Sequence, residues 1–323
     1  MSAEWDCVVV GGGAAGLSAA LVMGRARRRT LVVDAGRQSN LAAPGIGGLL
    51  GNDGTPPAEL YATGRAELAK YPTVVVRRGE VVDGAADGGG FVLELGDGSR
   101  LRCRKVVLAT GMDYRSPAVS GLADGWGSWA FHCPFCHGWE MRDQPLAVLA
   151  GGDRAVHMAL MLRAWTEDVI VLTDGTAGFD AGQQDRLAAA GIGVDERAIA
   201  EMRSEVDRLV SVEFEDGASV ARSGVLVATT LSQRSRLAQR LGVAFAAPGP
   251  LSEDAVEVDQ FHRTSVPGVF AAGDVCAQMP QVAAAVASGS LTGAAVVQSL
   301  LADDVGLPMP PWPIEKENVN VDA

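Results

Sequence analysis

The sequence is poor in cysteine and in basic residues, and both shortages narrow what the protein can be. Five cysteines among 323 residues are too few and too scattered for a disulfide scaffold, and a reducing compartment is expected. Any disulfide in this chain is therefore expected to take part in chemistry. Lys and Arg total 27 against 39 Asp and Glu, and the net charge of −12 argues against a nucleic-acid partner because it repels phosphate backbones.

Neither a leader segment nor a membrane span is expected from the sequence. Residues 5–10 already have the pattern of a strand and no basic segment precedes them, so no signal peptide is expected. The one charge-free stretch of membrane length, 281–302, contains Ser288, Gly289, Ser290, Thr292, Gly293, Gln298 and Ser299. This composition predicts a close-packed helix in a cytoplasmic protein with no membrane partner.

What the sequence does contain is apolar material for a core. With 48% apolar and 20% charged residues the chain is expected to be folded, and its length predicts two compact units. The N-terminus has the pattern of a strand at 5–10, a glycine turn at 11–16, a helix at 17–28 and a strand at 30–34. This is the opening of a βαβ fold.

The glycine turn has the pattern of a dinucleotide-binding site. Gly11, Gly13 and Gly16 occupy the three positions of a GxGxxG fingerprint. These glycines allow the tight turn, the approach of a pyrophosphate and the close packing of a helix whose N-terminus attracts the anion. Asp34 closes the second strand, where its carboxylate would accept hydrogen bonds from an adenosine ribose. A glycine turn without a ligand is the less favoured alternative.

The same order of elements recurs later in the chain. A strand at 105–111 ends the first fold, and the repeat then consists of a strand at 146–149, a turn at 150–152, a helix at 153–165 and strands at 168–172 and 225–230. We therefore predict an α/β protein with two Rossmann-like dinucleotide-binding domains, each a three-layer ββα unit. The second domain, 116–245, is inserted between the two parts of the first, 1–115 and 246–323.

A CxxC pair, Cys133 and Cys136, lies in the inserted domain. Next to βαβ patterns such a pair indicates a redox site. A structural zinc half-site and an accidental pair are the alternatives. Zinc is disfavoured because Cys7, Cys103 and Cys276 form no second pair of ligands, and no metal site is expected.

The residues around the pair suggest roles for its members. Pro134 fits the first turn of a helix and places Cys133 near the N-cap, where the helix dipole lowers a thiol pKa, so Cys133 is the expected exchange thiol. His137 is a candidate base, because imidazole titrates near neutral pH and can take the proton of an incoming thiol. The role of His132 is left open.

Aromatic residues concentrate around the same pair. Five of them fall within 14 residues: Trp126, Trp129, Phe131, Phe135 and Trp139. They are either ordinary core at a domain interface or an apolar pocket that admits a small substrate. In the second interpretation His132, Phe135 and Trp139 are the candidate lining residues.

Taken together, these motifs resemble low-molecular-weight thioredoxin reductases over nearly the whole chain. The shared features are the glycine fingerprint, the LATG strand end at Gly111, the CxxC in the insert and the AAGD sequence at Gly273 and Asp274. The resemblance implies a homodimer with FAD in the first fold. The implied FAD contacts are Gly11, Gly13 and Gly16 at the pyrophosphate, Asp34 at the ribose, Gly111, Gly273 and Asp274 toward the flavin, and Gln281 and Val282 opening the helix beneath the isoalloxazine.

The second nucleotide turn departs from that family. Three glycines are usual there, but this chain has Ala150 at the first position and Arg154 where a small residue lets the pyrophosphate approach. The arginine cluster that grips the 2′-phosphate of NADPH is missing, since Asp174 follows the strand and no Arg or Lys occurs before Arg186. We expect a nicotinamide domain that has lost its ligand, so that NAD(P)H is not used.

The CPFCHG segment departs as well, because His137 stands where thioredoxin reductases carry aspartate. It resembles flavin-dependent dithiol oxidases that close disulfides in small natural products such as gliotoxin and holomycin. The resemblance implies a small dithiol substrate, Cys136 as the flavin-proximal thiol, and dioxygen as the acceptor, giving hydrogen peroxide. An NAD(P)H-dependent thioredoxin reductase and a non-catalytic redox sensor are the alternatives. The dithiol is not named by the sequence, and the tail 308–313 is either disordered or lines a partner's cleft.

Overall fold

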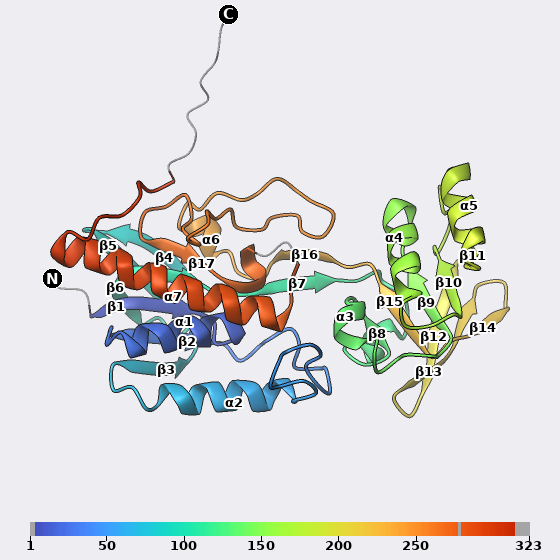
Figure 1. Cartoon of the computed structure of the whole chain (residues 1–323), viewed down its shortest axis with the longest axis horizontal. Helices are drawn as coiled ribbons and strands as arrows, with labels where there is room; N and C mark the ends of the chain where they lie inside the picture. Colours follow the sequence, from blue (N-terminus) through green and yellow to red (C-terminus); the bar gives the residue numbers. More distant parts are fainter. Residues whose placement is uncertain (1–3, 277–278, 314–323) are drawn as a thin grey trace, which may run out of the picture. The chain divides into compact units, whose positions relative to one another are not determined.

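The computed structural model describes residues 4–276 and 279–313. The chain divides into two compact units (Figure 1). Unit 1 comprises Met1–Ser39, Ala58–Asp113 and Leu231–Ala323, and unit 2 comprises Asn40–Pro57 and Tyr114–Thr230. The prediction of one fold inserted in another is therefore confirmed.

Unit 1 is built on a seven-stranded sheet in the order β3-β2-β1-β6-β5-β4, with β17 also paired to β6. The strands are β1 (Trp5–Val10), β2 (Thr30–Asp34), β3 (Val74–Arg78), β4 (Val81–Asp87), β5 (Gly90–Leu95), β6 (Arg100–Leu108) and β17 (Val269–Ala271). β4, β5 and β6 form the antiparallel meander, and the other pairings are parallel. Val8 and Val10 face one core cluster and Val9 faces another, as expected of a parallel strand buried on both sides.

Helices cover this sheet. They are α1 (Ala14–Arg25), α2 (Pro57–Leu68), α6 (Leu237–Arg240), α7 (Val282–Val305) and the 3-10 helix η2 (Gly273–Cys276). α7 is long and apolar enough to cross a membrane by length and composition alone. It packs directly on α1, however, because a Cβ at Gly289 would lie 2.1 Å from the Ala15 carbonyl oxygen and one at Gly293 would lie 2.6 Å from that of Ala19. The close-packed helix is therefore present as predicted.

Unit 2 repeats the plan with a five-stranded parallel sheet in the order β11-β10-β9-β15-β8, beside an antiparallel sheet in the order β12-β13-β14. Its strands are β8 (Ala130–Phe131), β9 (Leu146–Leu149), β10 (Val169–Leu172), β11 (Gly193–Asp195), β12 (Ile199–Glu205), β13 (Arg208–Phe214), β14 (Ser219–Ala221) and β15 (Gly224–Val227). Its helices are η1 (Leu122–Gly125), α3 (Pro134–His137), α4 (Gly152–Leu162) and α5 (Ala181–Ala189). β9, α4 and β10 follow one another as β1, α1 and β2 do, which confirms the internal repeat.

The unit boundaries differ from the predicted ones. Residues 231–245 belong to unit 1, because Leu237 and Leu241 are buried in the same core cluster as Val8. The Pro-Gly-Pro sequence at 248–250 lies inside this unit. The chain crosses between units at β7 (Met112–Arg115) and β16 (Thr230–Gln233), which pair with each other. Asn40–Pro57 groups with unit 2, and no sequence feature indicated this.

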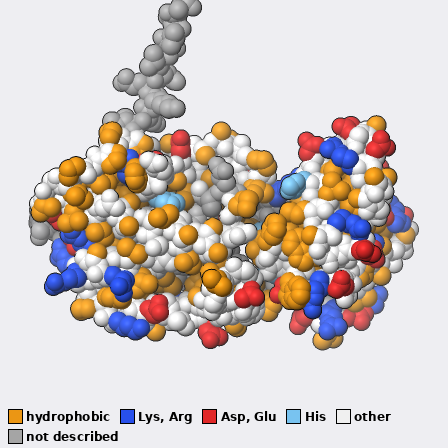
Figure 2. Space-filling view, viewed as in Figure 1, with side chains coloured by type: hydrophobic (Ala, Val, Ile, Leu, Met, Phe, Trp, Pro, Cys, Tyr) orange, Lys and Arg blue, Asp and Glu red, His pale blue; other side chains and the backbone are white. Residues whose placement is uncertain are grey.

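Charge is mixed on the surface. On the face shown in Figure 2, Lys and Arg side chains are interspersed with Asp and Glu side chains over both units. Many basic residues are paired with acids, as Arg77 is with Asp97 (2.7 Å) and Arg104 is with Asp304 (2.7 Å). Exposed pairs of this kind contribute little to stability, about 0–1 kcal/mol each.

Candidate redox site and cofactor cradle

The first glycine turn is a cradle that only glycine fits. Gly11 has a positive φ of 112°, and a Cβ there would lie 2.1 Å from the Ala109 carbonyl oxygen. A Cβ at Gly16 would lie 1.9 Å from the Gly11 carbonyl oxygen. By contrast, the nearest atom to a Cβ at Gly13 would be 3.6 Å away, on Gln38. The turn is therefore packed tightly toward the protein and is more open at Gly13, as a pyrophosphate site requires.

The helix that follows this turn has a free N-terminus. α1 has Gly13 as its N-cap, with no side-chain cap and no acidic residue in the first turn. α7 likewise begins at Val282, with Gln281 as an N-cap that has no side-chain hydrogen bond. Unsatisfied N–H groups at a helix N-terminus attract anions. Gly13, Gln281 and Val282 thus lie where the resemblance placed them, at helix starts suited to an anionic cofactor.

Asp34 lies at the end of β2 and faces the same turn. Its carboxylate accepts hydrogen bonds from the N–H groups of Gly12 (3.2 Å) and Gly36 (3.0 Å). The Gln38 side-chain amide also donates to it (3.0 Å). This arrangement fits a ribose-binding carboxylate, and Gln38 is a neighbour that the sequence reasoning missed.

Gly273 joins the cradle from the C-terminal part of unit 1. It has a positive φ of 79°, and its N–H donates to Ser288 Oγ (3.0 Å). A Cβ at Gly273 would lie 2.8 Å from the Ala15 Cβ on α1. Asp274 follows in η2, and Gly111 follows β6 with a positive φ of 68°. The fold thus brings Gly273 to the start of α1, although more than 250 residues separate them in sequence.

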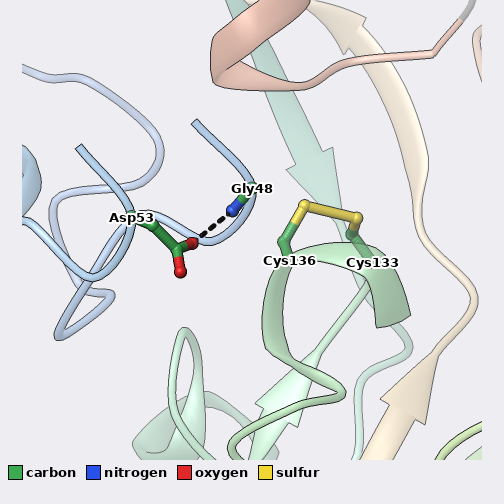
Figure 3. The surroundings of a disulfide bond; sticks show 4 residues. All are labelled: Gly48, Asp53, Cys133 and Cys136. Atoms are coloured by element: carbon green, nitrogen blue, oxygen red, sulfur yellow. Dashed lines mark hydrogen bonds between the residues drawn. A yellow bond between two sulfur atoms is a disulfide. The ribbon is translucent and has the colours of Figure 1, made fainter. Parts of the chain in front are cut away.

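Cys133 and Cys136 form a disulfide in unit 2 (Figure 3), with Cα atoms 5.4 Å apart. Cys133 is the N-cap of α3 and Pro134 occupies its first turn, as predicted. Cys133 is buried, with 9% of its surface exposed, whereas Cys136 is half-buried. Exposure in this disulfide state therefore does not single out Cys133 as the exchange thiol, and that assignment stays a prediction based on the N-cap.

A glycine-rich loop, Gly45–Gly54, lies against the disulfide-bearing helix. A Cβ at Gly47 would lie 2.4 Å from the Cys136 carbonyl oxygen. The Gly48 N–H donates to Asp53 Oδ1 (2.8 Å) and closes the loop on itself (Figure 3). The sequence reasoning missed this loop, although its run of glycines was a signal for a close backbone approach.

His137 is the predicted base. Its ring stacks on Phe131, with centroids 5.8 Å apart. Neither ring nitrogen has a hydrogen-bond partner among the described residues. Burial lowers the pKa of His137, and the charge of Glu140 and the carbonyls of Cys133 and Gly127 oppose this shift. Burial thus favours the neutral imidazole, the form in which one ring nitrogen can accept a proton.

The three candidate pocket residues differ in their surroundings. His132 packs between Tyr114 (4.5 Å) and Trp126 (5.7 Å), and burial, then the charges of His137 and Arg154, lower its pKa to about 4. Phe135 and Trp139 are 59% and 66% exposed. Trp129 and Phe131 are therefore core, whereas Phe135 and Trp139 are exposed, and a substrate pocket lined by them stays a prediction.

The other cysteines are free thiols; Cys7 and Cys103 are buried and Cys276 is half-buried. Burial raises the pKa of Cys103 to about 12, and it raises that of Cys7 well above its usual range. Burial, followed by the charge of Asp274, raises that of Cys276 to about 12. Within residues 4–276 and 279–313, no three His, Cys, Asp or Glu side chains are arranged to hold a metal ion.

The second glycine turn is crossed by an arginine. Arg154, in the first turn of α4, donates from Nη2 to the Thr229 carbonyl oxygen (2.7 Å), just beyond β15. β9 and β15 are neighbouring parallel strands, so this hydrogen bond spans the crevice at their carboxyl ends. That crevice is where dinucleotides bind in doubly wound folds. Asp174, after β10, accepts from the Ile199 N–H (2.7 Å) and thus has a structural role.

Comparison with known proteins agrees with this geometry. The family model described as pyridine nucleotide-disulphide oxidoreductase matches residues 5–289. The chain belongs to this family. As a member of the pyridine nucleotide-disulphide oxidoreductases it is a flavin-dependent redox enzyme, and the expectation of a flavin cofactor is confirmed.

The relatives extend over nearly the whole chain. Thioredoxin reductase tcpT of Claviceps purpurea is 33% identical and covers 92% of this chain and 95% of its own. Thioredoxin reductase sirT of Leptosphaeria maculans is 30% identical, with coverages of 93% and 96%. The crystal structure of HlmI is 37% identical with a TM-score of 0.88, covering 94% of this chain and 96% of its own. An oxidoreductase from Agrobacterium tumefaciens is also 37% identical, with a TM-score of 0.87 and coverages of 92% and 99%.

Proposed function

We propose that this family member is an FAD-dependent dithiol oxidase that forms an intramolecular disulfide in a small natural-product dithiol. Dioxygen is the electron acceptor and hydrogen peroxide the second product. The observation that carries the proposal is the hydrogen bond from Arg154 to Thr229 across the second nucleotide crevice. A reductase needs that crevice for NAD(P)H, whereas an oxidase takes its electrons from the dithiol.

The residues around the crevice support the same conclusion. The Arg154 guanidinium has no carboxylate partner among the residues that the structure describes, and its partial burial lowers its pKa. Asp174 follows β10, where the adenosine ribose of a dinucleotide lies in this fold. Its carboxylate accepts a hydrogen bond from the Ile199 N–H instead. Arg186, the first arginine after β10, donates to the Gly182 carbonyl oxygen (3.1 Å), and Arg197, the next, is paired with Asp195 (2.6 Å).

The surface beside the disulfide supports a small apolar substrate. Phe135 stands edge-on to Trp165 with centroids 5.4 Å apart, and the Arg142 guanidinium lies 3.9 Å above the Trp139 ring. These contacts hold two exposed aromatic side chains in fixed positions at α3. An apolar dithiol gains from burial against such rings, at about 25 cal/mol per Å² of apolar surface covered.

The residues of this chain account for the thiol chemistry. A substrate thiolate, whose proton passes to His137, attacks Cys133 Sγ, and the Cys133–Cys136 bond breaks to leave a Cys136 thiolate and a mixed disulfide. The second substrate thiol then attacks its own mixed disulfide and releases Cys133. The substrate loses two electrons and two protons, and the cysteine pair gains them. FAD, held by the Gly11–Gly16 cradle, Asp34 and the start of α7, supplies the acceptor for these electrons and the centre where dioxygen is reduced.

Oxygen consumption with a purified small dithiol tests this proposal. The wild-type enzyme is expected to consume oxygen continuously and to form equimolar hydrogen peroxide. Cys136→Ser should stop consumption, whereas the matched control Cys276→Ser should retain it because Cys276 is a free cysteine outside the pair. A single stoichiometric turnover would favour the redox-sensor alternative. Turnover that requires NADPH and a protein disulfide would favour the thioredoxin reductase named among the relatives.

A further inference from the structure

The C-terminal segment Pro308–Pro313 is bound to unit 1 by a buried arginine. α7 ends at Val305, and Gly306 caps it with a positive φ of 71°. Arg263 is only 4% exposed, and its guanidinium donates to the carbonyl oxygens of Pro310 (2.9 Å) and Pro311 (3.0 Å). The Asp259 carboxylate balances the buried charge at 2.6 Å. The tail is therefore docked on its own chain, in contrast to both expectations from the sequence.

Trp312 fixes the far end of this segment. Its indole Nε1 donates to the Thr264 carbonyl oxygen (2.7 Å). The indole ring meets Phe270 edge-on, with centroids 5.2 Å apart and planes at 79°. Phe270 is fully buried in β17, so the tryptophan contacts the core of the unit directly.

The composition of the segment suits this docking. Four of its six residues are proline, which restricts the unfolded chain and lowers the entropy lost on docking. Proline also lacks an N–H, so the backbone of this segment presents mainly carbonyl groups. A buried guanidinium with five donors is the matching partner for such a surface.

The docked segment is linked to the flavin cradle through β17. Arg263 forms a β-bridge with Phe270, and the Ala271 N–H donates to the His262 carbonyl oxygen (3.1 Å). Two residues beyond Ala271 the chain reaches Gly273, whose backbone lies against Ala15 at the start of α1. The tail therefore holds the loop 259–264, and this loop holds the strand that leads into the cradle.

We infer that Pro308–Pro313 is a strap that retains the flavin, with Arg263 and Trp312 as positioning residues. The strap fixes β17 against β6 and so keeps Gly273 and Asp274 in place beside α1. The inference depends only on membership of a flavin-binding family and not on the proposed oxidase reaction.

Flavin affinity of truncated chains tests the strap. A chain ending at Gly306 lacks it, and a control chain ending at Pro313 keeps it. We expect the dissociation constant for FAD, measured by flavin fluorescence on dilution, to rise about tenfold in the shorter chain, which corresponds to about one lost aromatic contact. The control should match the full chain. The melting temperature of the FAD-loaded protein should fall by more than that of the apoprotein.

Point variants keep the test decisive if the shorter chain does not fold. Trp312→Phe keeps a ring against Phe270 but removes the donor to Thr264, so it should raise the dissociation constant by less than Trp312→Ala does. An unchanged FAD affinity in Trp312→Ala, or equal losses of melting temperature with and without FAD, would show a purely structural role and overturn the inference. Normal FAD affinity without dithiol oxidation would instead contradict the proposed function alone.

Discussion

Gly47→Ala tests whether the loop Gly45–Gly54 and the disulfide helix fit together as the structure shows. The new Cβ would lie 2.4 Å from the Cys136 carbonyl oxygen, and ordinary contact begins near 3.4 Å. One of the two backbones must therefore move by about 1 Å. Overpacking of this kind costs about 1–3 kcal/mol, equivalent to about 2–12 °C in melting temperature for a domain of this size.

The displacement should also be visible at the disulfide. Loop movement away from α3 exposes Cys136, so the rate at which a soluble phosphine reduces the disulfide should rise, by about the factor of 5–100 that 1–3 kcal/mol of local opening allows. Gly249→Ala is the matched control, because it is also a loop glycine and a Cβ there has no atom within 4 Å. If Gly47→Ala keeps the melting temperature and the reduction rate of this control, the contact between loop and helix is refuted.

Three further variants test the proposed base, the exposed aromatic side chains and the buried Arg263 ion pair. His137→Gln should remove the acid limb of the rate profile for dithiol oxidation, whose midpoint in the wild type should lie below pH 6.5 because burial lowers the His137 pKa; an unchanged profile would exclude His137 as the base. Trp139→Ala should raise KM for an apolar dithiol about tenfold at nearly constant kcat, which steady-state kinetics measures, and an unchanged KM would exclude the exposed aromatic surface as a binding surface. Asp259→Asn leaves the buried Arg263 uncompensated and should lower stability by about 3–5 kcal/mol in denaturant unfolding; a loss below about 1 kcal/mol would contradict it.

Because Asp259 is ionised in its pair with Arg263, we expect stability to depend on pH. Burial opposes ionisation of Asp259, but the hydrogen bonds and charge of Arg263 and the Phe261 N–H together hold its pKa below the usual value. Its folded pKa is lower than its unfolded pKa, so its contribution is complete above about pH 4 and is lost as pH falls through the folded pKa. Asp259→Asn should therefore flatten the acid limb of the plot of melting temperature against pH. The same slope in the variant and the wild type would contradict this.

Local patterns were enough to predict much of the fold. The GxGxxG turn, Pro134 after Cys133, and the uncharged helix with Gly289 and Gly293 each have a short-range physical reason, and the structure shows each in place. The internal repeat could also be predicted from the sequence, because both folds need the same strand, turn and helix in the same order.

The remaining features depend on contacts between distant parts of the chain. Gly47 meets Cys136 and Arg263 meets Pro310, and neither pairing leaves a periodic signal in the sequence. Leu237 lies inside the predicted inserted domain, 116–245, and only its burial in the core of unit 1 shows that it belongs there. Arg154 was recognised as a departure from a nucleotide turn, but its acceptor Thr229 is 75 residues away.

The most direct test of the central claim is anaerobic reduction of the bound flavin, followed by its absorbance near 450 nm. Rapid bleaching by a small dithiol, with no bleaching by NADPH or NADH over the same period, is the result expected if Arg154 closes the second crevice and electrons enter through Cys133 and Cys136. Rapid bleaching by either nucleotide, with none by the dithiol, would contradict the account.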